Sequence, residues 1–483
     1  MKKQGNVDGR RFQLRISVFG YMSADRERSM GNRMKKIAAV ICNYNKSAYV
    51  TECIQSVTES VFRDFDMIVV DNASTDDSVE RIREKYGEQV RLFVNKENLG
   101  GSGGFNTGIR YALEKGYEYV WCLDNDVLVD ENAIGELYGF MERHPEAGMC
   151  GSKVYHMEAP DYVQQFGIDI VWEEYCCEAK YYNRLEDGSM PEVVYSDAVA
   201  ACSVLVRTSL IREIGPLPEE NFLYWDDTEW GLRCNRAGYK VASIGRSKVL
   251  HCMGAKKETV DTFPLYYSWR NWIRFFMKYT PRENWEGMCT AFLEGIFEVV
   301  CNDLYLGEEN RAKTVMHAYD DAIHGRMGRA EDHKIHPVVH SEKKLKELLR
   351  GQKRIRIYEN RREEQARCFA ERVRKAAQEE GMKLSVEVLP GHALDKRSGY
   401  KEPLSEEPLK ESEPRQITFT MTEDVFRLEA GKLGLATCYV DYEGRIVSSA
   451  EDAFLLLNIP DSRRLFLFSQ MDLFLSAVKN MHA

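Results

Sequence analysis

The sequence predicts an α/β protein with two domains, and three observations support this. The chain has 483 residues, more than a single ordinary hydrophobic core contains. From residue 35 onwards, short apolar runs alternate with segments of helical periodicity, a pattern typical of parallel strands with helices on both faces. After a polar segment near residue 335, the alternation begins again and continues towards the end of the chain.

The composition excludes several classes of protein. The net charge of −10 disfavours nucleic acid as a partner, since binding its phosphates needs a basic surface. The 13 cysteines form no C-x-x-C pair, so neither a zinc ribbon nor a thioredoxin-type site is expected. No run of about eighteen apolar residues occurs, so no membrane span is expected, and the scattered cysteines favour the cytoplasm.

The elements of the first domain follow one another in a regular order. Helical segments separate four predicted strands, which are "KIAAVICNY", "DMIVVD", "VRLFVN" and "YEYVWC". Ligands of such sheets bind at the carboxyl ends of the strands. The polar motifs "CNYN", "DNAS" and "DND" follow three of these strands, so we expect them to meet at one edge of the sheet.

The boundaries of the first domain follow from composition. Residues 1–34 lack the sustained apolar core of a signal peptide, and a flexible extension is predicted. Because Met34 directly precedes the first strand, a start at this residue is the alternative. The first domain is expected to span residues 35–255, and the aromatic-rich segment 256–325 is expected to complete it with helices.

A linker and a second domain are predicted beyond this point. Residues 326–342 are polar, and Pro337 breaks any helix that would align the histidines there. We therefore expect solvated histidines rather than a metal site at His333, His336 and His340. Residues 343–483 are predicted to form an accessory α/β domain without a catalytic motif. A chain truncated near residue 335 should then keep a soluble first domain.

Two carboxylates close the fourth strand. Asp124 and Asp126 directly follow an apolar run, where burying their charge is costly. Turn chemistry is the simplest interpretation of such a motif, because Asp and Asn side chains bond nearby backbone groups. The expected convergence with "CNYN" and "DNAS" favours a shared ligand site instead.

Several motifs together resemble a known family. The opening "AVICNYNKSAYVTECIQSVTESVFRDFDMIVVDNASTDDS" is followed in order by "ENLGGSGGFNTGIRYAL", "WCLDND", "FLYWDDTEWGLRCNRAGYK" and "VLH". This combination resembles family 2 glycosyltransferases with the GT-A fold, a nucleotide-sugar-binding mixed sheet with helices on both faces. It is most similar to the branch of bacterial rhamnosyltransferases and galactofuranosyltransferases. The resemblance covers residues 35 to about 280 and does not extend to residues 341–483.

The resemblance implies a divalent cation, Mn²⁺ or Mg²⁺, at the "DND" motif. Asp126 would bind the metal, and Asp124 would bind the ribose or reach the metal through water. His251, at the end of "SKVLH", would be the second metal ligand, and its imidazole would tilt the preference towards Mn²⁺. The cation would neutralise charge on the leaving diphosphate.

The resemblance also assigns residues to the nucleotide sugar. Tyr44 would stack on the base, and Asp71 would accept hydrogen bonds from the base or ribose. The loop "NLGGSGGFNTG" lacks both the Walker and the dinucleotide patterns. Its glycines, Gly101 among them, would let the backbone approach the donor, and Asn98 and Asn106 would contact it.

The motif "YWDDTEW" is expected to form the acceptor side. The resemblance makes Asp227 the catalytic base and gives Asp226 a role in binding the acceptor. Trp225 and Trp230, together with Tyr224, would form an aromatic platform for a sugar. Helix capping is the alternative explanation for the two carboxylates, which precede a helical segment.

These assignments predict an inverting, metal-dependent glycosyltransferase. The donor would be dTDP-rhamnose, UDP-galactofuranose or another UDP-sugar, and the acceptor a hydroxyl of a glycan or lipid-linked acceptor in bacterial cell-surface polysaccharide synthesis. One alternative is a sugar-1-phosphate nucleotidyltransferase, which the first loop "NYNKSAYV" disfavours because it lacks that class's glycine-rich basic loop. The other alternative is a sugar-nucleotide-binding module without catalysis.

Residues 256–278 suggest a peripheral contact with the inner face of the membrane. Basic and aromatic residues on one helix can hold it at an anionic bilayer. Packing of the aromatics against the first domain is the equally weighted alternative. The segment contains Lys256, Lys257, Trp269, Arg270, Trp272, Arg274, Phe275, Phe276 and Lys278.

Overall fold

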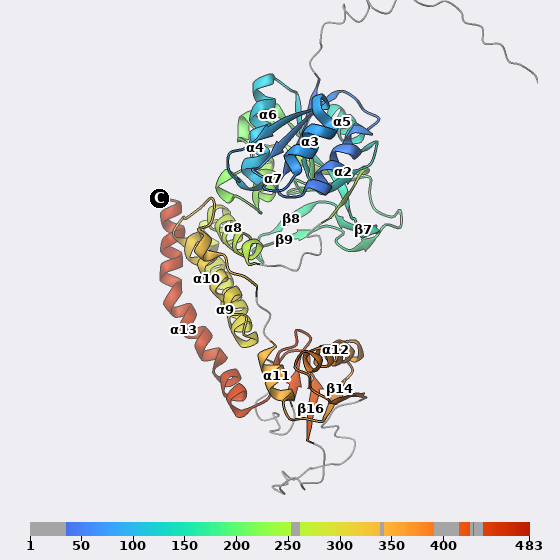
Figure 1. The fold of residues 1–483 in the computed structure, drawn as a ribbon. Coiled ribbons are helices and arrows are strands. Elements are labelled where there is room, and N and C mark those ends of the chain that lie inside the picture. The colour runs from blue at the N-terminus through green and yellow to red at the C-terminus, as the bar shows by residue number, and fades with distance from the viewer. Residues whose placement is uncertain (1–34, 253–260, 339–341, 391–414, 426–427, 429–437) are drawn as a thin grey trace, which may run out of the picture.

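The computed structural model shows a large α/β domain, a group of long helices and a smaller α/β domain (Figure 1). It describes residues 35–252, 261–338, 342–390, 415–425, 428 and 438–483. The predicted extension at residues 1–34 and His340 of the predicted linker lie outside the described residues.

The first sheet has eleven strands and combines parallel with antiparallel pairs. Its main path runs β10-β7-β6-β12-β4-β1-β2-β3. The parallel half consists of β1 (Ile37–Asn43), β2 (Phe65–Asp71), β3 (Val90–Val94) and β4 (Tyr119–Asp124). The other half contains β5 (Val127–Val129), β6 (Ala147–His156), β7 (Ala159–Gln165), β10 (Arg184–Leu185), β11 (Val193–Ser196), β12 (Ser203–Arg207) and β13 (Lys240–His251). The hairpin β8 (Ile168–Val171) and β9 (Cys176–Ala179) forms a separate small sheet.

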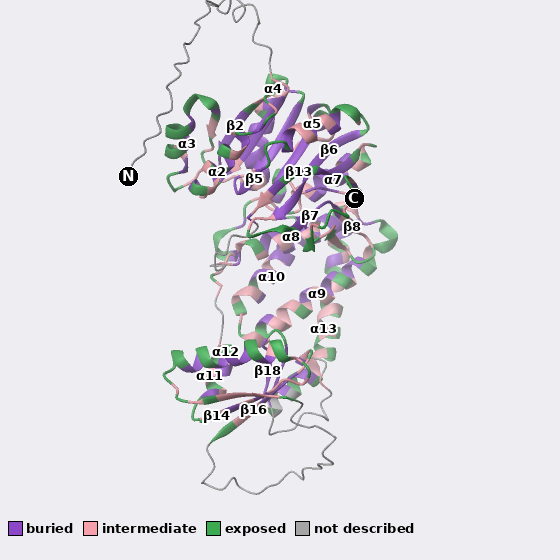
Figure 2. Ribbon diagram, turned by 90° about the vertical axis from the view of Figure 1, so that its right-hand side faces the viewer, coloured by how far each residue is buried: buried purple, intermediate pink, exposed green. Residues whose placement is uncertain are grey.

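Alternation along the strands explains why both faces of this sheet are covered. In β1, Ile37, Ala39 and Ile41 belong to one apolar cluster, whereas Ala38 and Val40 belong to another. The first cluster includes residues of α2 (Ser47–Thr58), α3 (Ser78–Tyr86) and α5 (Ala133–Arg143); the second includes residues of α4 (Gly100–Lys115), α6 (Thr208–Ile214) and α7 (Asp226–Arg236). Figure 2 shows the resulting buried strands between helices that are exposed on their outer sides. The predicted fold class is confirmed.

Helices beyond the first sheet enclose a third, aromatic cluster. They are α8 (Phe263–Tyr279), α9 (Trp285–Leu306), α10 (Glu309–Ile323) and the C-terminal α13 (Ala450–Met481), which runs beside α9 and α10 (Figure 1). Phe474 and Val478 of α13 are fully buried in this cluster. The last helix of the chain therefore completes a core that includes Ile170 and α8, which differs from the predicted boundary at residue 343.

The described part of the segment 256–278 does not support the membrane contact. Phe275 and Phe276 are buried in the aromatic cluster, and Arg270 is 1% exposed with its guanidinium bonded to the carbonyls of Gly328 and Asn221. Lys256 and Lys257 lie outside the described residues. Packing, the alternative interpretation, accounts for these aromatics. No helix of the described chain has the length and apolar character needed to cross a bilayer.

The predicted linker is partly packed where it is described, although His333 is exposed as predicted. Lys334 is buried and donates to both carboxylate oxygens of Asp321 at 2.9 Å. The backbone N–H of His336 donates to Thr262 Oγ1, and its carbonyl accepts from the N–H of Thr262. These contacts fix residues 329–337 against α8 and α10.

The second sheet has five strands in the order β15-β14-β16-β17-β18. All pairs are parallel except β17 with β18. The strands are β14 (Arg354–Tyr358), β15 (Ser385–Leu389), β16 (Gln416–Met421), β17 (Cys438–Val440) and β18 (Ile446–Val447), and α11 (Lys343–Leu349) and α12 (Glu363–Glu379) share their apolar cluster. The prediction of a second, smaller α/β unit is confirmed, although α13 leaves this unit to pack elsewhere.

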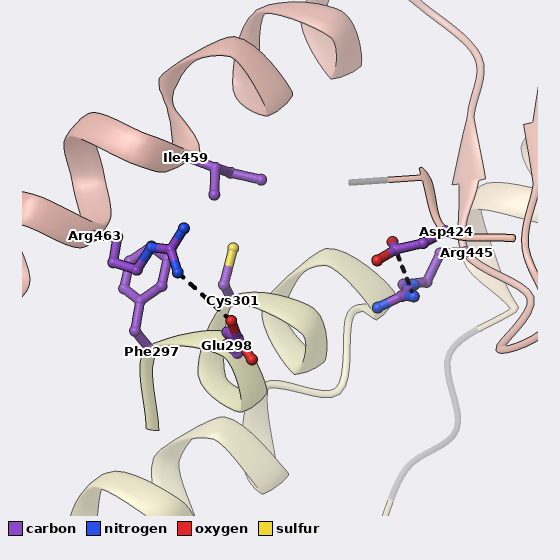
Figure 3. A pocket seen from close by; sticks show the side chains of 7 residues that line it. All are labelled: Phe297, Glu298, Cys301, Asp424, Arg445, Ile459 and Arg463. Atoms are coloured by element: carbon purple, nitrogen blue, oxygen red, sulfur yellow. Dashed lines mark hydrogen bonds and ion pairs between the residues drawn. The ribbon is translucent and has the colours of Figure 1, made fainter. Parts of the chain in front are cut away.

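A cleft of about 390 Å³ lies where α9, α13 and the second sheet meet (Figure 3). Arg463 of α13 pairs with Glu298 of α9 at 3.6 Å, and Arg445 pairs with Asp424 at 3.3 Å. Arg445 also donates to Asn302 Oδ1 of α9 at 2.9 Å, which ties the second sheet to the helices. None of the motif residues singled out in the sequence lines this cleft.

Candidate active site

Hydrogen bonds join the three strand-end motifs at one edge of the first sheet. Asn43 at the end of β1 donates to Asp71 Oδ2 at the end of β2, over 2.9 Å. Asn125, directly after β4, donates to Asn43 Oδ1 over 2.8 Å. The convergence expected for parallel strands therefore occurs, and Asp124 and Asp126 flank the joining amide.

The antiparallel pairing of β5 with β13 brings His251 to these carboxylates. His251 pairs in register with Val127, which follows Asp126 directly, and the N–H of Cys252 donates to the Asp126 carbonyl. His251 Nε2 lies 3.4 Å from Asp126 Oδ1 and 3.7 Å from Asp124 Oδ2. One ligand atom from each of the three residues lies within 4.8 Å of the other two.

This group fits a hard divalent cation. Two carboxylates and an imidazole, all able to direct one atom at the same point, are ligands that Mn²⁺ and Mg²⁺ accept. Asp126 and His251 are largely buried, with side chains 6% and 14% exposed, while Asp124 is 38% exposed. The group is therefore open on one side, as a site shared with a ligand requires.

Lys46 supplies a cation that the sequence analysis missed. Lys46 lies on the loop between β1 and α2, and its ammonium is 2.6 Å from Asp126 Oδ2. The available signal was its position two residues after Tyr44, directly after the strand-end motif "CNYN". Lys46 and His251 thus contact different oxygens of one carboxylate.

The charges of the three ligands depend on one another. Burial favours the neutral form of Asp126, but His251 and Lys46 outweigh it and hold its pKa below the usual value. Burial also disfavours the imidazolium of His251, but the carboxylates Asp126 and Asp124 raise its pKa overall. Burial raises the pKa of Asp124 to about 6, with His251 opposing the shift. The ionised forms of Asp124 and Asp126 are therefore stabilised by positive charge placed beside them.

A strained segment precedes the second pair of carboxylates. Phe222, Tyr224 and Trp225 all have left-handed backbone conformations, with φ values of 65°, 64° and 64°. Such conformations are costly for non-glycine residues and persist where the surroundings enforce them. Here Asn271 of α8 donates to the carbonyls of Asn221, Leu223 and Tyr224, at 2.8, 2.6 and 3.1 Å.

Gly100 makes the same strained segment possible from the other side. It has a φ of 75°, and a Cβ at this position would lie 2.0 Å from the carbonyl oxygen of Phe222. The glycine-rich segment also lets α4 lie close to the sheet, because a Cβ at Gly104 would lie 2.3 Å from Cys42 Sγ. In this structure these two glycines permit contacts within the protein.

Asp226 and Asp227 form the first turn of α7. Ser102 donates to Asp226 Oδ2 at 2.8 Å, and the N–H of Thr228 donates to Asp227 Oδ1 at 2.7 Å. Burial and the charge of Asp227 raise the pKa of Asp226 to about 7. Burial likewise raises the pKa of Asp227. Asp226 can therefore accept a proton near neutral pH, and the raised pKa of Asp227 makes it a stronger base than an ordinary carboxylate.

Residues 201 and 202 connect this pair to the metal-ligating group. The N–H of Ala201 lies 3.4 Å from Asp227 Oδ2, and the carbonyl of Cys202 accepts from the N–H of Asp124. The charge of Asp226 contributes to the raised pKa of Asp124. The two acidic groups therefore face a common region.

The aromatic residues of "YWDDTEW" divide into two sets. Tyr224 is 42% exposed, and Trp225 is half-buried with its ring nearly parallel to that of Trp272, at a centroid distance of 6.3 Å. Trp230, in contrast, is 1% exposed and donates from Nε1 to the Gly215 carbonyl. The structure does not support Trp230 as an acceptor platform, because α7 directs it into the core of the first domain.

The residues assigned to the donor also differ in exposure. Tyr44 is 43% exposed and presents its ring at the strand end. Asp71 is fully buried, and Asn43 and the N–H of Ser74 donate to its carboxylate, so it organises the loop in this structure. Asn106 is also fully buried and bonds the backbone of Leu217, which leaves it no surface for a donor.

Two further donor assignments lie in the loop before α4. Asn98 Oδ1 accepts from Asn72 and from the N–H of Gly100, so it shapes this loop. Gly101 is the second residue of α4, and a Cβ at this position would lie 3.5 Å from Leu223. Its contact with a donor stays a prediction.

The fold and the site define an α/β protein with a group of residues that could hold a divalent cation at one edge of its sheet. Residues 38–202 match the model described as glycosyl transferase family 2. The sequence-based family prediction is confirmed, and with it a glycosyltransferase rather than a nucleotidyltransferase.

Individual relatives are more distant. The chain is 24% identical over 276 residues to the dTDP-rhamnosyl transferase RfbF of Shigella flexneri, covering 56% of this chain and 89% of that protein. It is 22% identical over 261 residues to the galactofuranosyltransferase GlfT2 of Mycolicibacterium smegmatis, covering 49% and 40%. Among solved structures, GalNAc-T7 with UDP, GalNAc and Mn²⁺ is 13% identical with a TM-score of 0.43, covering 54% and 51%.

Proposed function

We propose that the protein is an inverting, metal-dependent glycosyltransferase. It transfers a sugar from a nucleotide-diphosphate sugar to a hydroxyl of a glycan or lipid-linked acceptor in cell-surface polysaccharide synthesis. The observation that carries the proposal is the cation-binding group of Asp124, Asp126 and His251 beside the carboxylates Asp226 and Asp227. One group suits the leaving diphosphate and the other the attacking hydroxyl.

The donor side holds the diphosphate with positive charge. A divalent cation bound by Asp126, His251 and Asp124 would act as a Lewis acid on the diphosphate oxygens. Lys46 pairs with Asp126 in this structure, and it can turn to a phosphate when another cation takes that carboxylate. Tyr44 offers an exposed ring face for the base. The family relatives named for dTDP-rhamnose and galactofuranose make these sugars the first donors to test.

The acceptor side supplies the base. In a single displacement, the acceptor oxygen forms a bond to the anomeric carbon while the bond from this carbon to the diphosphate breaks. Asp227 accepts the hydroxyl proton, and the nucleoside diphosphate leaves with the electron pair of the broken bond. Attack from the face opposite the leaving group inverts the anomeric configuration. Asp226 and Trp225 hold the acceptor beside the base.

Release of nucleoside diphosphate tests this proposal directly. The purified protein is incubated with dTDP-rhamnose, UDP-galactofuranose and other UDP-sugars, with and without Mn²⁺, chelator and glycan acceptors. We expect release from one donor that stops with chelator and recovers with Mn²⁺ or Mg²⁺, and an inverted linkage by NMR. Donor binding without release would favour a binding module, and full activity in chelator would contradict the metal site.

The location stays a prediction of the same proposal. All 13 cysteines are free thiols, which fits the reducing cytoplasm where nucleotide sugars would be used. Trp269, Arg270, Phe275 and Phe276 of that segment are buried, so the proposal includes no membrane contact through α8.

A further inference from the structure

A directional chain of hydrogen bonds leads from His251 to the protein surface. His251 Nδ1 lies 2.8 Å from Gln164 Oε1, and Gln164 Nε2 lies 3.4 Å from His156 Nδ1. His156 Nε2 in turn lies 2.8 Å from Oδ1 of the exposed Asn183. The sequence offered no signal for this chain, because its members come from separate strands and a turn.

The sheet brings these side chains together. His251 of β13 and His156 of β6 are register partners in a parallel pair, and β7, which carries Gln164, pairs with the same end of β6. Gln164 is 5% exposed, so its amide is held among protein groups rather than in water. A buried amide satisfies its polar atoms through such partners, and losing one is costly.

The amide oxygen accepts only, which fixes the proton of His251. With this oxygen at Nδ1, His251 must carry its proton on Nδ1 and donate to Gln164. In the neutral imidazole, the Nε2 lone pair is then on the side of Asp124 and Asp126, where the distances are 3.7 and 3.4 Å. The rest of the chain agrees, because the Gln164 amide nitrogen donates to His156 Nδ1 and His156 donates from Nε2 to Asn183.

We propose that Gln164 is a positioning residue for the metal ligand His251. It holds the imidazole in the tautomer, and at the ring angle, that directs the Nε2 lone pair to a divalent cation shared with Asp124 and Asp126. This inference rests on the proposed metal site. Residues behind a metal ligand typically change metal affinity by about 10–100-fold when they are removed.

Metal affinity tests the proposal without any turnover. Mn²⁺ binding is titrated by electron paramagnetic resonance in the wild type, Gln164→Met and Gln164→Glu, with Mn²⁺ alone and with Mn²⁺ plus UDP or dTDP. We expect Gln164→Met, which keeps the length but loses the acceptor, to weaken binding about 10–100-fold. Gln164→Glu keeps an acceptor and should bind at least as tightly as the wild type. Gln165→Met, on the same strand but half-exposed, is the matched control and should bind normally.

The tautomer is read separately in the metal-free protein. Long-range ¹H–¹⁵N NMR at a pH where His251 is neutral should show a protonated Nδ1 in the wild type and in Gln165→Met. Gln164→Met should show a mixture or the other tautomer. Unchanged Mn²⁺ affinity and an unchanged tautomer in folded Gln164→Met would overturn the proposal. Absence of Mn²⁺ binding by the wild type would overturn the metal site itself, while the NMR result still decides what Gln164 does.

Discussion

Two groups of carboxylates in this chain, one in each domain, are balanced in opposite ways. In the second domain, Asp441 is fully buried but accepts from the guanidinium of Arg445 at 2.5 Å. Asp452 similarly accepts from Lys344 at 2.6 Å. In the first domain, Asp226 and Asp227 stand side by side and accept from Ser102 and backbone N–H groups instead. A positive charge beside Asp226 and Asp227 would lower their pKa values, and they would then accept a proton less readily, as a base must.

This difference separates structural from functional charge. A buried ion pair is strongly destabilised when one partner is removed, because the other charge remains buried alone. A partly buried pair of like charges, such as Asp226 and Asp227, destabilises the fold as it stands, and its retention is explained by chemistry. The comparison predicts that neutralising a carboxylate lowers activity in the first domain and lowers stability in the second.

The largest effect is expected at Asp227. Asp227→Asn keeps the shape of the side chain but removes the base, so turnover should fall by roughly 10²–10⁴-fold. Donor and Mn²⁺ affinities should stay near those of the wild type, as calorimetry can show. An Asp227→Asn protein with near-normal turnover would mean that another group accepts the proton. Catalysis would then not explain why Asp226 and Asp227 lack a positive partner.

Removal of the second domain tests whether the two regions are separable. A chain ending at residue 338 loses α13, whose Phe474 and Val478 are buried against α9 and α10. We expect this chain to aggregate or melt well below the full-length protein, because truncation exposes the aromatic cluster. Size-exclusion chromatography and a thermal melt measure this, with Phe468→Ala, at an 86% exposed position of α13, as the control that should change little. A soluble, donor-binding truncation would restore the boundary that the sequence predicted.

Asp441→Asn should show the opposite pattern from Asp227→Asn. It weakens the bonds to Arg445, which is 8% exposed, and the free energy of unfolding should fall by about 1–3 kcal/mol. Turnover per folded molecule should stay unchanged, because the residue lies outside the first domain. Urea denaturation and initial rates on the same preparation separate the two effects. A loss of turnover without a loss of stability would contradict the structural role.

The sequence predicted the regular parts of this molecule because they depend on local patterns. The alternation of apolar runs with helical segments predicted the parallel strands of the first sheet. Because parallel strands bring their carboxyl ends together, Asp124, Asp126 and the loop of Asp71 could be placed at one edge. His251 and the pair Asp226 and Asp227 needed the family resemblance, since the antiparallel return of β13 has no local signal.

The remaining features depend on tertiary contacts. Trp230 and Asp226 are four residues apart on one helix, and only the packing of α7 decides which of them enters the core. Gln164 and Asn271 act through partners far away in the chain. The packing of α13 against the helices of the first domain was not predicted, because the composition of this long helix suits either domain equally well.

Lys46→Met is expected to have a smaller effect, which raises the affinity for Mn²⁺ and lowers the affinity for the donor. Lys46→Met removes the ammonium that pairs with Asp126, so Mn²⁺ alone should bind more tightly, by roughly 10-fold if the pair is worth 1.5 kcal/mol. The donor should bind more weakly, because one cation for its diphosphate is lost. Calorimetric titrations with Mn²⁺ and with each nucleoside diphosphate measure both. Parallel changes in the two affinities would argue against this exchange of partners.

The smallest effect is expected in the pH dependence, and it tests the like-charge pair directly. Turnover requires an ionised base, so it should rise with pH through the raised pKa values of the pair, near the value of about 7 given by burial and Asp227 for Asp226. Because these pKa values are raised in the folded protein, ionising the carboxylates also lowers stability as the pH rises above their unfolded values.

Asp226→Asn removes the neighbouring charge and should move the midpoint of the turnover profile to lower pH, if the remaining base is Asp227. It should also make the melting temperature less sensitive to pH between 5 and 8, by roughly 2–4 °C for each kcal/mol of repulsion removed. The corresponding change in the second domain, Asp452→Asn, should leave the midpoint where it is, because Asp452 lies beside Lys344 and its pKa is lowered. A midpoint that stays in place in Asp226→Asn would show that the two carboxylates titrate independently and that burial alone sets the proton affinity of the base.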